Sequence, residues 1–256
     1  NTNIAIAGFS SVERYKPDTL TWVKDNKRLV NAKLDLPVLL AVVQSDTDMD
    51  FPNIIISNES KRAFFSIIDH FFSEESAKPA IGTGTYISDN VKLGSNIQIG
   101  NNCVIDGDIV IGDNTVVEHN VVIANKVTIG RSCYIQSCSC IGHDGYGYSE
   151  DENHNKTMIR HYGGVEIGNN VFIGAHVNIA RGTIDDTVIS SGVKIAPSTH
   201  IGHNNHIDEN ASIVCSNLYG SVTIGRNAYV SACTIRNQIK IGDSSIVGMG
   251  AIVTKD

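Results

Sequence analysis

The stretch from Ile81 to Ile141 decides the fold of this chain, and it reads IGTGTYISDNVKLGSNIQIGNNCVIDGDIVIGDNTVVEHNVVIANKVTIGRSCYIQSCSCI. Every sixth residue of the stretch is aliphatic, without a slip. Glycine often follows the aliphatic residue, and asparagine or aspartate often comes shortly after it. The aliphatic series consists of Ile81, Ile87, Leu93, Ile99, Ile105, Ile111, Val117, Ile123, Ile129, Ile135 and Ile141.

A period of six predicts a stack of coils built from short parallel strands. Side chains alternate between the two sides of a strand, so a repeat of six points each aliphatic side chain to the same side. Three such strands make one coil of a triangular prism, of about 18 residues, and Gly, Asn and Asp tolerate the backbone angles of its corners. The pattern resumes over 167–179, 189–213 and 224–253. We therefore predict a mainly β fold, a parallel β-helix over residues 79–256.

The longest interruption of the repeat lies at 142–166. It contains HDGYGYSEDENHNKTMIRHYGGVE, which is too polar and too rich in glycine to form a coil. Long loops on rigid scaffolds often carry function. We expect this segment to protrude from the prism and to take part in a site.

Residues 1–78 lack the repeat and predict a small α/β domain. Strands are expected at 37–43 and 53–57, and a helix at 59–75. One face of that helix is apolar, and we interpret it as core, although a helix lying on a membrane surface is an alternative. The face consists of Ala63, Phe64, Ile67, Ile68, Phe71 and Phe72.

Trp22 is the single tryptophan, and it stands among charged residues in the segment LTWVKDNKRL. It is either ordinary core or a platform that stacks on a nucleobase while neighbouring cations hold phosphate. The second interpretation makes residues 1–78 a nucleotide-binding domain.

Bulk properties narrow the functional class. The 256 residues carry a formal net charge of −7, which argues against nucleic acid as the main partner. We find no signal peptide and no apolar run of the roughly 18 residues that a membrane span needs. The six cysteines form no CxxC pair, so we expect reduced thiols in a cytoplasmic protein, with Cys103 and Cys133 packed inside the coils.

Three segments carry a resemblance to a known family. The loop DGYGY at 144–148 is similar to that family's DGFGY, RGTIDDT at 181–187 to its RGALDDT, and IGHN at 201–204 to its IAHN. On these segments the chain resembles the UDP-3-O-acylglucosamine N-acyltransferases, the lipid A enzymes called LpxD. The resemblance implies a left-handed β-helix, assembly into a homotrimer, and transfer of an acyl group from a thioester to a sugar amine.

The resemblance also implies which residues form the site. The histidine of the family's IAHN segment is its proposed general base, and that role falls on His203. A neutral imidazole can take the proton that an amine must lose, an effect worth about 10² to 10⁴ in rate. The residues expected to hold the nucleotide and the sugar are Trp22, Asp25, Arg28, His143, Asp144, Gly145, Tyr146, Gly147, Tyr148, Asp185 and Asn204.

Other histidines offer alternatives. A solvated surface position is the simplest interpretation of His119, His176, His200 and His206. The spacing of His200, His203 and His206 also resembles a set of metal ligands, but neighbouring coils supply no convincing partners, so we expect no metal.

Two departures from the family shape the expected substrates. The second histidine of the family, in an NGH segment one coil later, has no counterpart in 234–238, and the chain ends at Asp256 without the family's C-terminal helical extension. We therefore expect a short acyl group, acetyl in the first place, to come from acyl-CoA and to go to a UDP- or dTDP-linked amino sugar for surface polysaccharide or glycan synthesis. The alternatives are a true lipid A enzyme that uses acyl carrier protein, and a noncatalytic β-helix that only binds a nucleotide sugar.

Overall fold

The computed structural model describes residues 4–25, 38–44, 51–73 and 80–256, and contacts divide the chain into units of residues 1–77 and 78–256. In the described part of the first unit, four parallel strands form a sheet in the order β1-β2-β3-β4. The strands are β1 (Gly8–Phe9), β2 (Thr19–Val23), β3 (Leu40–Val43) and β4 (Ile54–Ile56). The 3-10 turn η1 (Val12–Arg14) lies between β1 and β2, and helix α2 (Ser60–Phe72) follows β4.

Helix α2 covers one face of this sheet. Phe64 is buried against Leu20 and Val42, and the helix residues Ala63, Ile67 and Ile68 pack around them. The prediction of an entirely buried apolar helix face was wrong at its end, because the side chain of Phe71 is 70% exposed in this unit. In the same turn of α2, Phe72 packs on Phe9 of β1 with ring centroids 5.7 Å apart, so the apolar contact of this turn is made by Phe72.

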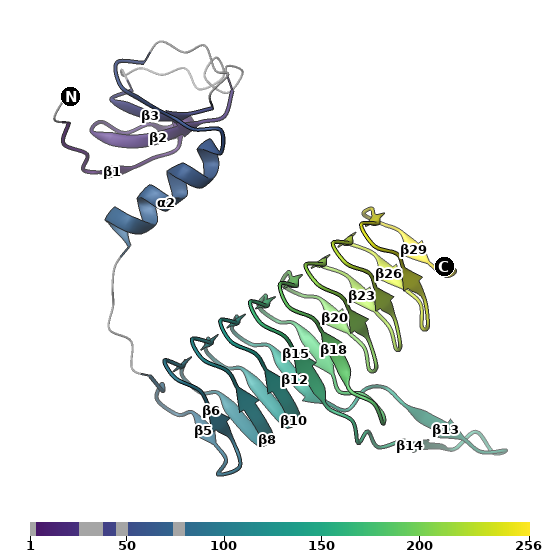
Figure 1. Ribbon diagram of the computed structural model, residues 1–256. Coiled ribbons are helices and arrows are strands. Elements are labelled where there is room, and N and C mark those ends of the chain that lie inside the picture. The colour runs from purple at the N-terminus through teal and green to yellow at the C-terminus, as the bar shows by residue number, and fades with distance from the viewer. Residues whose placement is uncertain (1–3, 26–37, 45–50, 74–79) are drawn as a thin grey trace. The chain divides into compact units, whose positions relative to one another are not determined.

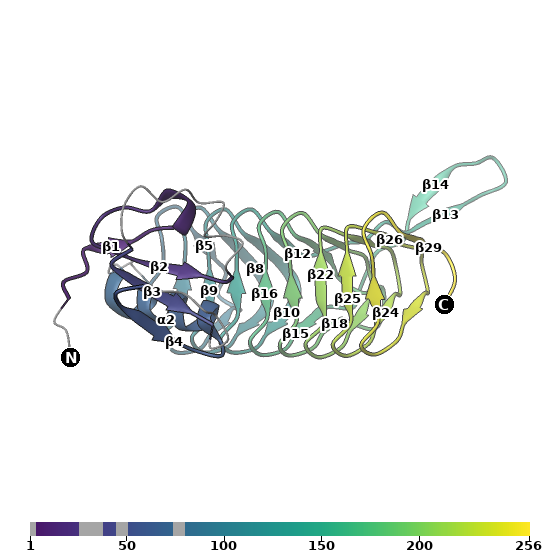
Figure 2. The same ribbon diagram turned by 90° about the horizontal axis from the view of Figure 1, so that it is seen from above.

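The second unit is a prism of stacked coils with three walls (Figures 1 and 2). One wall is a sheet in the order β28-β25-β22-β19-β16-β11-β9-β7. Its strands are β7 (Gln98–Ile99), β9 (Val116–Val117), β11 (Tyr134–Ile135), β16 (Phe172–Ile173), β19 (Lys194–Ile195), β22 (Ser212–Val214), β25 (Tyr229–Ser231) and β28 (Ile246–Val247).

The other two walls belong to one continuous sheet, because β8 (Val104–Ile111) and β10 (Val122–Ile129) each run through both. The wall that later carries the site holds β5 (Tyr86–Ile87), β12 (Cys140–His143), β17 (Asn178–Ala180), β20 (His200–Ile201), β23 (Asn217–Leu218), β26 (Thr234–Ile235) and β29 (Ile252–Val253). The remaining wall holds β6 (Lys92–Leu93), β15 (Val165–Ile167), β18 (Thr187–Ile189), β21 (His206–Ile207), β24 (Thr223–Ile224) and β27 (Lys240–Ile241).

The aliphatic repeat forms the core of the prism, as its period predicts. Ile105, Ile123 and Ile141 stack in register, and each is 0% exposed. In the first coil Ile81 and Leu93 stay partly exposed, because the described coils cover them from one side only. Cys103 and Cys133 lie in the interior as free thiols.

The interruption at 142–166 is an ordered antiparallel hairpin of β13 (Tyr148–Glu150) and β14 (Lys156–Met158). It projects from the prism in both views (Figures 1 and 2), and the coil resumes at β15. Because both ends of the hairpin return to the prism, the residues at its base lie against the wall that carries β12, β17 and β20.

Candidate active site around His203

His203 stands at a corner of the prism, between β20 and β21. The corner needs a left-handed residue, and Asn204 supplies it with φ of 57°. The next residue, Asn205, is buried, and its Nδ2 donates to the carbonyl oxygens of Gly202 and Tyr219, both at 2.7 Å. The corner is thus tied to the following coil, which fixes the backbone that carries His203.

The side chain of Asn204 orients the imidazole of His203. Its Oδ1 lies 3.0 Å from His203 Nδ1 and also accepts hydrogen bonds from the backbone N–H and the hydroxyl of Thr183, while its Nδ2 donates to the carbonyl of Asp185. An amide oxygen only accepts, so His203 Nδ1 carries the proton in this arrangement. The lone pair of the neutral ring is therefore on Nε2.

The Nε2 side of the ring faces Gly220 of the next coil. A Cβ atom at position 220 would lie 2.7 Å from both Nε2 and Cε1 of His203. Only a residue without a side chain leaves this nitrogen accessible.

The base of the hairpin closes over the same corner. Arg181 pairs with Asp144 at 2.9 Å (Nε to Oδ1), and the backbone N–H of Arg181 donates to the carbonyl of His143. A Cβ at Gly145 would lie 2.9 Å from His203 Cδ2. Gly145 therefore packs directly on the imidazole.

Asp186 fastens the other end of the hairpin. Its carboxylate accepts the backbone N–H of Gly164 at 2.6 Å and pairs with the Lys126 ammonium at 3.0 Å. Burial by itself raises the pKa of this carboxyl, but these donors outweigh burial and hold the pKa below its ordinary value. The RGTIDDT segment thus acts as a clamp on the hairpin.

A pocket of about 440 Å³ lies in front of His203. It is large enough for part of a substrate, and its walls come from the hairpin base and from four successive coils. The lining residues are His143, Asp144, Gly145, Tyr146, Ala180, His200, Gly202, His203, Tyr219, Gly220 and Asn237.

His200 belongs to this pocket, which corrects its interpretation as a solvated surface histidine. Its ring is partly buried, and its Nδ1 lies 2.8 Å from Asn178 Oδ1, so its Nε2 also carries the lone pair. Burial lowers the pKa of His200, and the nearby His143 lowers it further. The alternation of the strand turns His200 outward, and only the hairpin base then covers it, which the repeat alone does not reveal.

The structure brings together five of the expected site residues, His143, Asp144, Gly145, Tyr146 and His203. Asn204 acts from behind His203, and Asp185 contributes its carbonyl to Asn204. Gly147 and Tyr148 continue into β13 and do not line the pocket. Sequence reasoning missed Tyr219, Gly220 and Asn237, which reach the pocket because neighbouring coils stack about 17 residues apart at this point.

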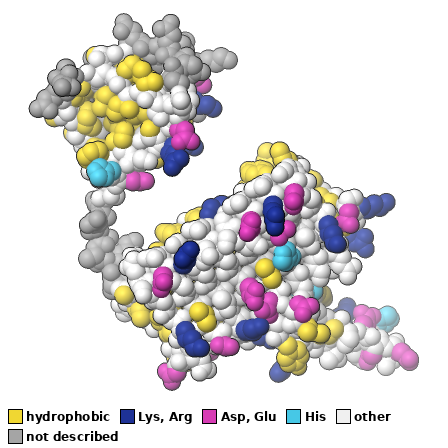
Figure 3. Space-filling model, viewed as in Figure 1, with side chains coloured by type: hydrophobic (Ala, Val, Ile, Leu, Met, Phe, Trp, Pro, Cys, Tyr) yellow, Lys and Arg dark blue, Asp and Glu magenta, His cyan; other side chains and the backbone are white. Residues whose placement is uncertain are grey.

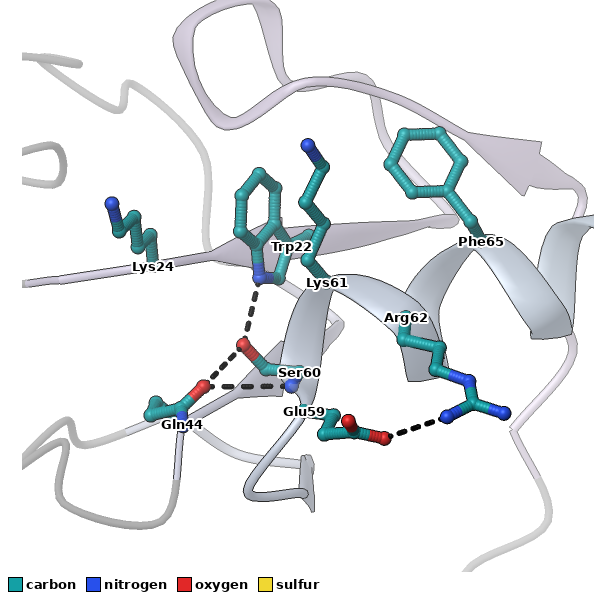
Figure 4. Close-up of a pocket in the computed structure, with 8 residues that line it drawn as sticks. All are labelled: Trp22, Lys24, Gln44, Glu59, Ser60, Lys61, Arg62 and Phe65. Atoms are coloured by element: carbon teal, nitrogen blue, oxygen red, sulfur yellow. Dashed lines mark hydrogen bonds and ion pairs between the residues drawn. The ribbon is translucent and has the colours of Figure 1, made fainter. Parts of the chain in front are cut away.

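A separate pocket of about 630 Å³ surrounds Trp22 in the first unit (Figure 4). The indole Nε1 donates to Ser60 Oγ at the start of α2 (2.9 Å), and that hydroxyl donates to Gln44 Oε1. The aromatic and cationic residues expected of a nucleotide site are present, namely Trp22, Lys24, Lys61, Arg62 and Phe65. Asp25 is exposed and does not line this pocket, and Arg28 lies outside the described residues.

Among the described residues, no group of three or more His, Cys, Asp or Glu side chains is arranged to hold a metal ion. His206 lies on β21, in a different wall from His200, and contacts Asp208. In the same part of the chain, no helix is long and apolar enough to cross a membrane. On the face of the prism in Figure 3, acidic and basic side chains are interspersed.

With the site in view, the chain can be compared with known proteins. Residues 108–143 match the family model described as bacterial transferase hexapeptide (six repeats). UDP-3-O-acylglucosamine N-acyltransferase of Delftia acidovorans is 35% identical over 117 residues, which cover 45% of this chain and 35% of that protein. The enzyme of the same name from Coxiella burnetii is 39% identical over 121 residues, covering 46% of this chain and 35% of that protein.

The chain is similar to the LpxD-like hexapeptide transferases.

Solved structures agree with this family at the level of the fold. LpxA from Acinetobacter baumannii has a TM-score of 0.62 and 26% identity, covering 69% of this chain and 67% of that one. The UDP-N-acetylglucosamine acyltransferase of Francisella novicida has a TM-score of 0.60 and 26% identity, covering 66% and 60%.

The matched segments span about a third of the length of the curated relatives, and those relatives are named for acyl transfer to an acylated UDP-glucosamine. Such relatives favour the lipid A alternative over our expectation of a short acyl group from acyl-CoA. The six-residue repeat gives no information on the length of the transferred acyl group. The end of the sequence at Asp256 was weak ground for choosing CoA as its carrier.

Proposed function

We propose that this LpxD-like chain transfers an acyl group from a thioester to the amine of a UDP-linked amino sugar, with His203 as the general base. The observation that carries the proposal is the Asn204 contact, which leaves the lone pair of His203 Nε2 beside the open position at Gly220. A base with a fixed tautomer, facing a pocket of substrate size, is what removal of a proton from an attacking amine requires.

The reaction balances with this one base. The amine nitrogen forms a bond to the thioester carbonyl carbon while His203 Nε2 takes one of its protons. The tetrahedral intermediate then expels the thiolate, which takes the proton back from the imidazolium, so that an amide and a free thiol are the products. We assign the backbone N–H of Gly220, next to Nε2 in the pocket, to the negative oxygen of the intermediate.

We assign the nucleotide to the pocket around Trp22. The hydrogen bond to Ser60 holds the indole in place, and Lys24, Lys61 and Arg62 supply positive charge for phosphate. Because Trp22 is the single tryptophan and lines this pocket, its fluorescence reports on the surroundings of this one side chain. Titration with UDP should quench it, and a Lys61→Ala/Arg62→Ala double variant should bind UDP more weakly with the same Tm. Unchanged fluorescence at millimolar UDP would remove the nucleotide from this pocket.

The first choice of substrates follows the names of the relatives. We propose a UDP-3-O-acylglucosamine acceptor and a 3-hydroxyacyl group carried by acyl carrier protein, and we propose a homotrimer as the active form. The decisive assay offers the chain this pair beside acetyl-CoA with a panel of UDP- and dTDP-amino sugars, and identifies products by mass spectrometry.

Each outcome of the assay has a distinct meaning. An N-acylated UDP-glucosamine formed from the carrier protein supports the lipid A reaction. Product from acetyl-CoA alone would replace it with short-chain transfer to an amino sugar. No product from any pair, in a protein that binds UDP, would favour a noncatalytic nucleotide-sugar-binding β-helix. Light scattering of the same sample tests the trimer.

A further inference from the structure

A second histidine, His161, lies behind the base, and its side chain is 0% exposed. It follows β14 in the descending arm of the hairpin. Its backbone N–H points to Asp144 Oδ2 at 3.4 Å, and its Nδ1 lies 3.0 Å from the carbonyl oxygen of Ile159. A carbonyl only accepts, so Nδ1 carries the proton and Nε2 carries the lone pair.

The Nε2 atom of His161 is buried and has no hydrogen-bond partner among the residues that the structure describes. Buried polar atoms without a partner are uncommon in native proteins. A phenylalanine would fill the same position with a ring of similar shape and without that acceptor, but it would lose the hydrogen bond to the Ile159 carbonyl. That bond explains Nδ1 but not the second, unpaired nitrogen.

The unpaired nitrogen lies next to the base. The rings of His161 and His203 meet edge to face, with their centroids 5.2 Å apart and their planes at 83°. A Cβ at Gly145 would lie 3.0 Å from His161 Nε2 and 2.9 Å from His203 Cδ2, so both atoms border the same small space. Gly147 allows the ring of His161 to approach from the other side, where a Cβ would lie 3.2 Å from its Cε1.

Gly220 and the hairpin residue His161 lie on different sides of the His203 ring. Gly220 adjoins the Cε1–Nε2 side of His203, which faces the substrate, whereas the hairpin residues adjoin its Cδ2 side. The coil that carries the family's second histidine has Asn237 in the pocket instead. The second imidazole of this site comes from the hairpin.

We propose that His161 is a positioning residue for His203, and that its Nε2 lone pair stabilises the imidazolium that His203 becomes when it accepts the proton from the amine. The inference rests on the proposed function. The acceptor is neutral and lies beside the Cδ2–H edge of the ring, so it does not repel the positive charge of the imidazolium. It is also shielded from water, and electrostatic interactions are strongest in such surroundings.

The test compares His161→Phe, which keeps the ring without the nitrogen, with His161→Gln, which keeps an acceptor without the ring. His154→Phe, at an exposed position of the same hairpin, is the matched control. The kcat, the KM for the acceptor and the Tm are measured for each, with the donor and acceptor that the wild-type chain uses.

We expect His161→Phe to keep a Tm close to that of the wild type, because the unpaired acceptor and the hydrogen bond to the Ile159 carbonyl are lost together, yet to have a kcat lower by about tenfold or more with KM within about twofold. His161→Gln should regain part of the kcat, and His154→Phe should behave as wild type. A His161→Phe variant with wild-type kcat, or two His161 variants whose kcat falls only in step with Tm, would overturn the proposal by showing a purely structural role. A wild-type chain that transfers no acyl group would overturn the proposed function itself, and this inference with it.

Discussion

His203 Nδ1 lies 3.0 Å from Asn204 Oδ1, and this contact between adjacent residues at a corner of the prism orients the imidazole that we propose as the general base. The corner requires a left-handed residue, asparagine tolerates that conformation, and the same asparagine fixes which nitrogen of the imidazole holds the proton. One residue thus serves both the fold and the site.

Replacing Asn204 with alanine should separate these two effects. The variant loses the contact that orients His203, so we expect kcat to fall by about 10²-fold, the loss typical of a displaced catalytic group. Asn210→Ala is the matched control, because Asn210 occupies an equivalent corner with φ of 59° but does not touch the pocket. Asn204→Ala should lose more thermal stability than Asn210→Ala, because the Asn204 side chain also bonds Thr183 and the Asp185 carbonyl. Equal kcat in the two variants would argue against an orienting role.

Gly220→Ala should block the base while the fold stays intact. The backbone of Gly220 lies outside the left-handed region, so alanine adds no conformational strain, but its Cβ would meet His203 Nε2 and Cε1 at 2.7 Å. We expect loss of most acyl transfer with UDP binding unchanged. Gly248→Ala, where no atom of the described residues lies within 4 Å of the added carbon, should keep full activity. A fully active Gly220→Ala would place the reaction elsewhere.

The repeat predicts the prism well because its interior obeys a local rule. Each inward aliphatic residue packs on the one above it, as Ile105, Ile123 and Ile141 do, so the period alone tells which side chains are buried. Asparagine marks some of the left-handed corners, such as Asn204 and Asn210, whereas others are formed by serine, cysteine or histidine.

The site follows no such local rule. His200 sits at an outward position of its strand and is covered only because the hairpin folds back over it, and His161 reaches His203 across 42 residues of sequence. The resemblance to the family identified His203 and the hairpin base, since short motifs carry over. Neither source indicated Gly220 or the second histidine, because both depend on how the hairpin and the next coil meet the corner.

The protonation of His200 should make the wild-type chain sensitive to mild acid. Its lowered pKa means that the folded state disfavours the charged ring, so the stability present above about pH 6.5 is lost as the pH falls through that lowered pKa. In His200→Gln this loss should shrink, whereas the two proteins should differ little at pH 8. Melting curves between pH 8 and pH 5 check this, and parallel pH profiles would contradict it.

Asp186→Asn should loosen the hairpin. The carboxylate holds the Gly164 N–H and Lys126, and a charge-assisted bond of this kind contributes about 1.5 to 3 kcal/mol. We expect a lower Tm and faster tryptic cleavage at Lys156 and Arg160 in the variant at pH 7. In the wild type the contribution is present above about pH 3.9 and disappears as the pH falls through the lowered pKa of Asp186. Cleavage at the wild-type rate would show that the clamp does not hold the hairpin.

The central claim is that His203 removes the proton from the acceptor amine, and the most direct measurement is the kcat of His203→Ala with the substrates that the wild type uses. The account predicts a fall of about 10² to 10⁴ with UDP binding at Trp22 unchanged, and no comparable fall for His206→Ala, whose exposed ring lies on another wall. A His203→Ala chain that retains a tenth or more of the wild-type kcat would contradict the assignment of the base.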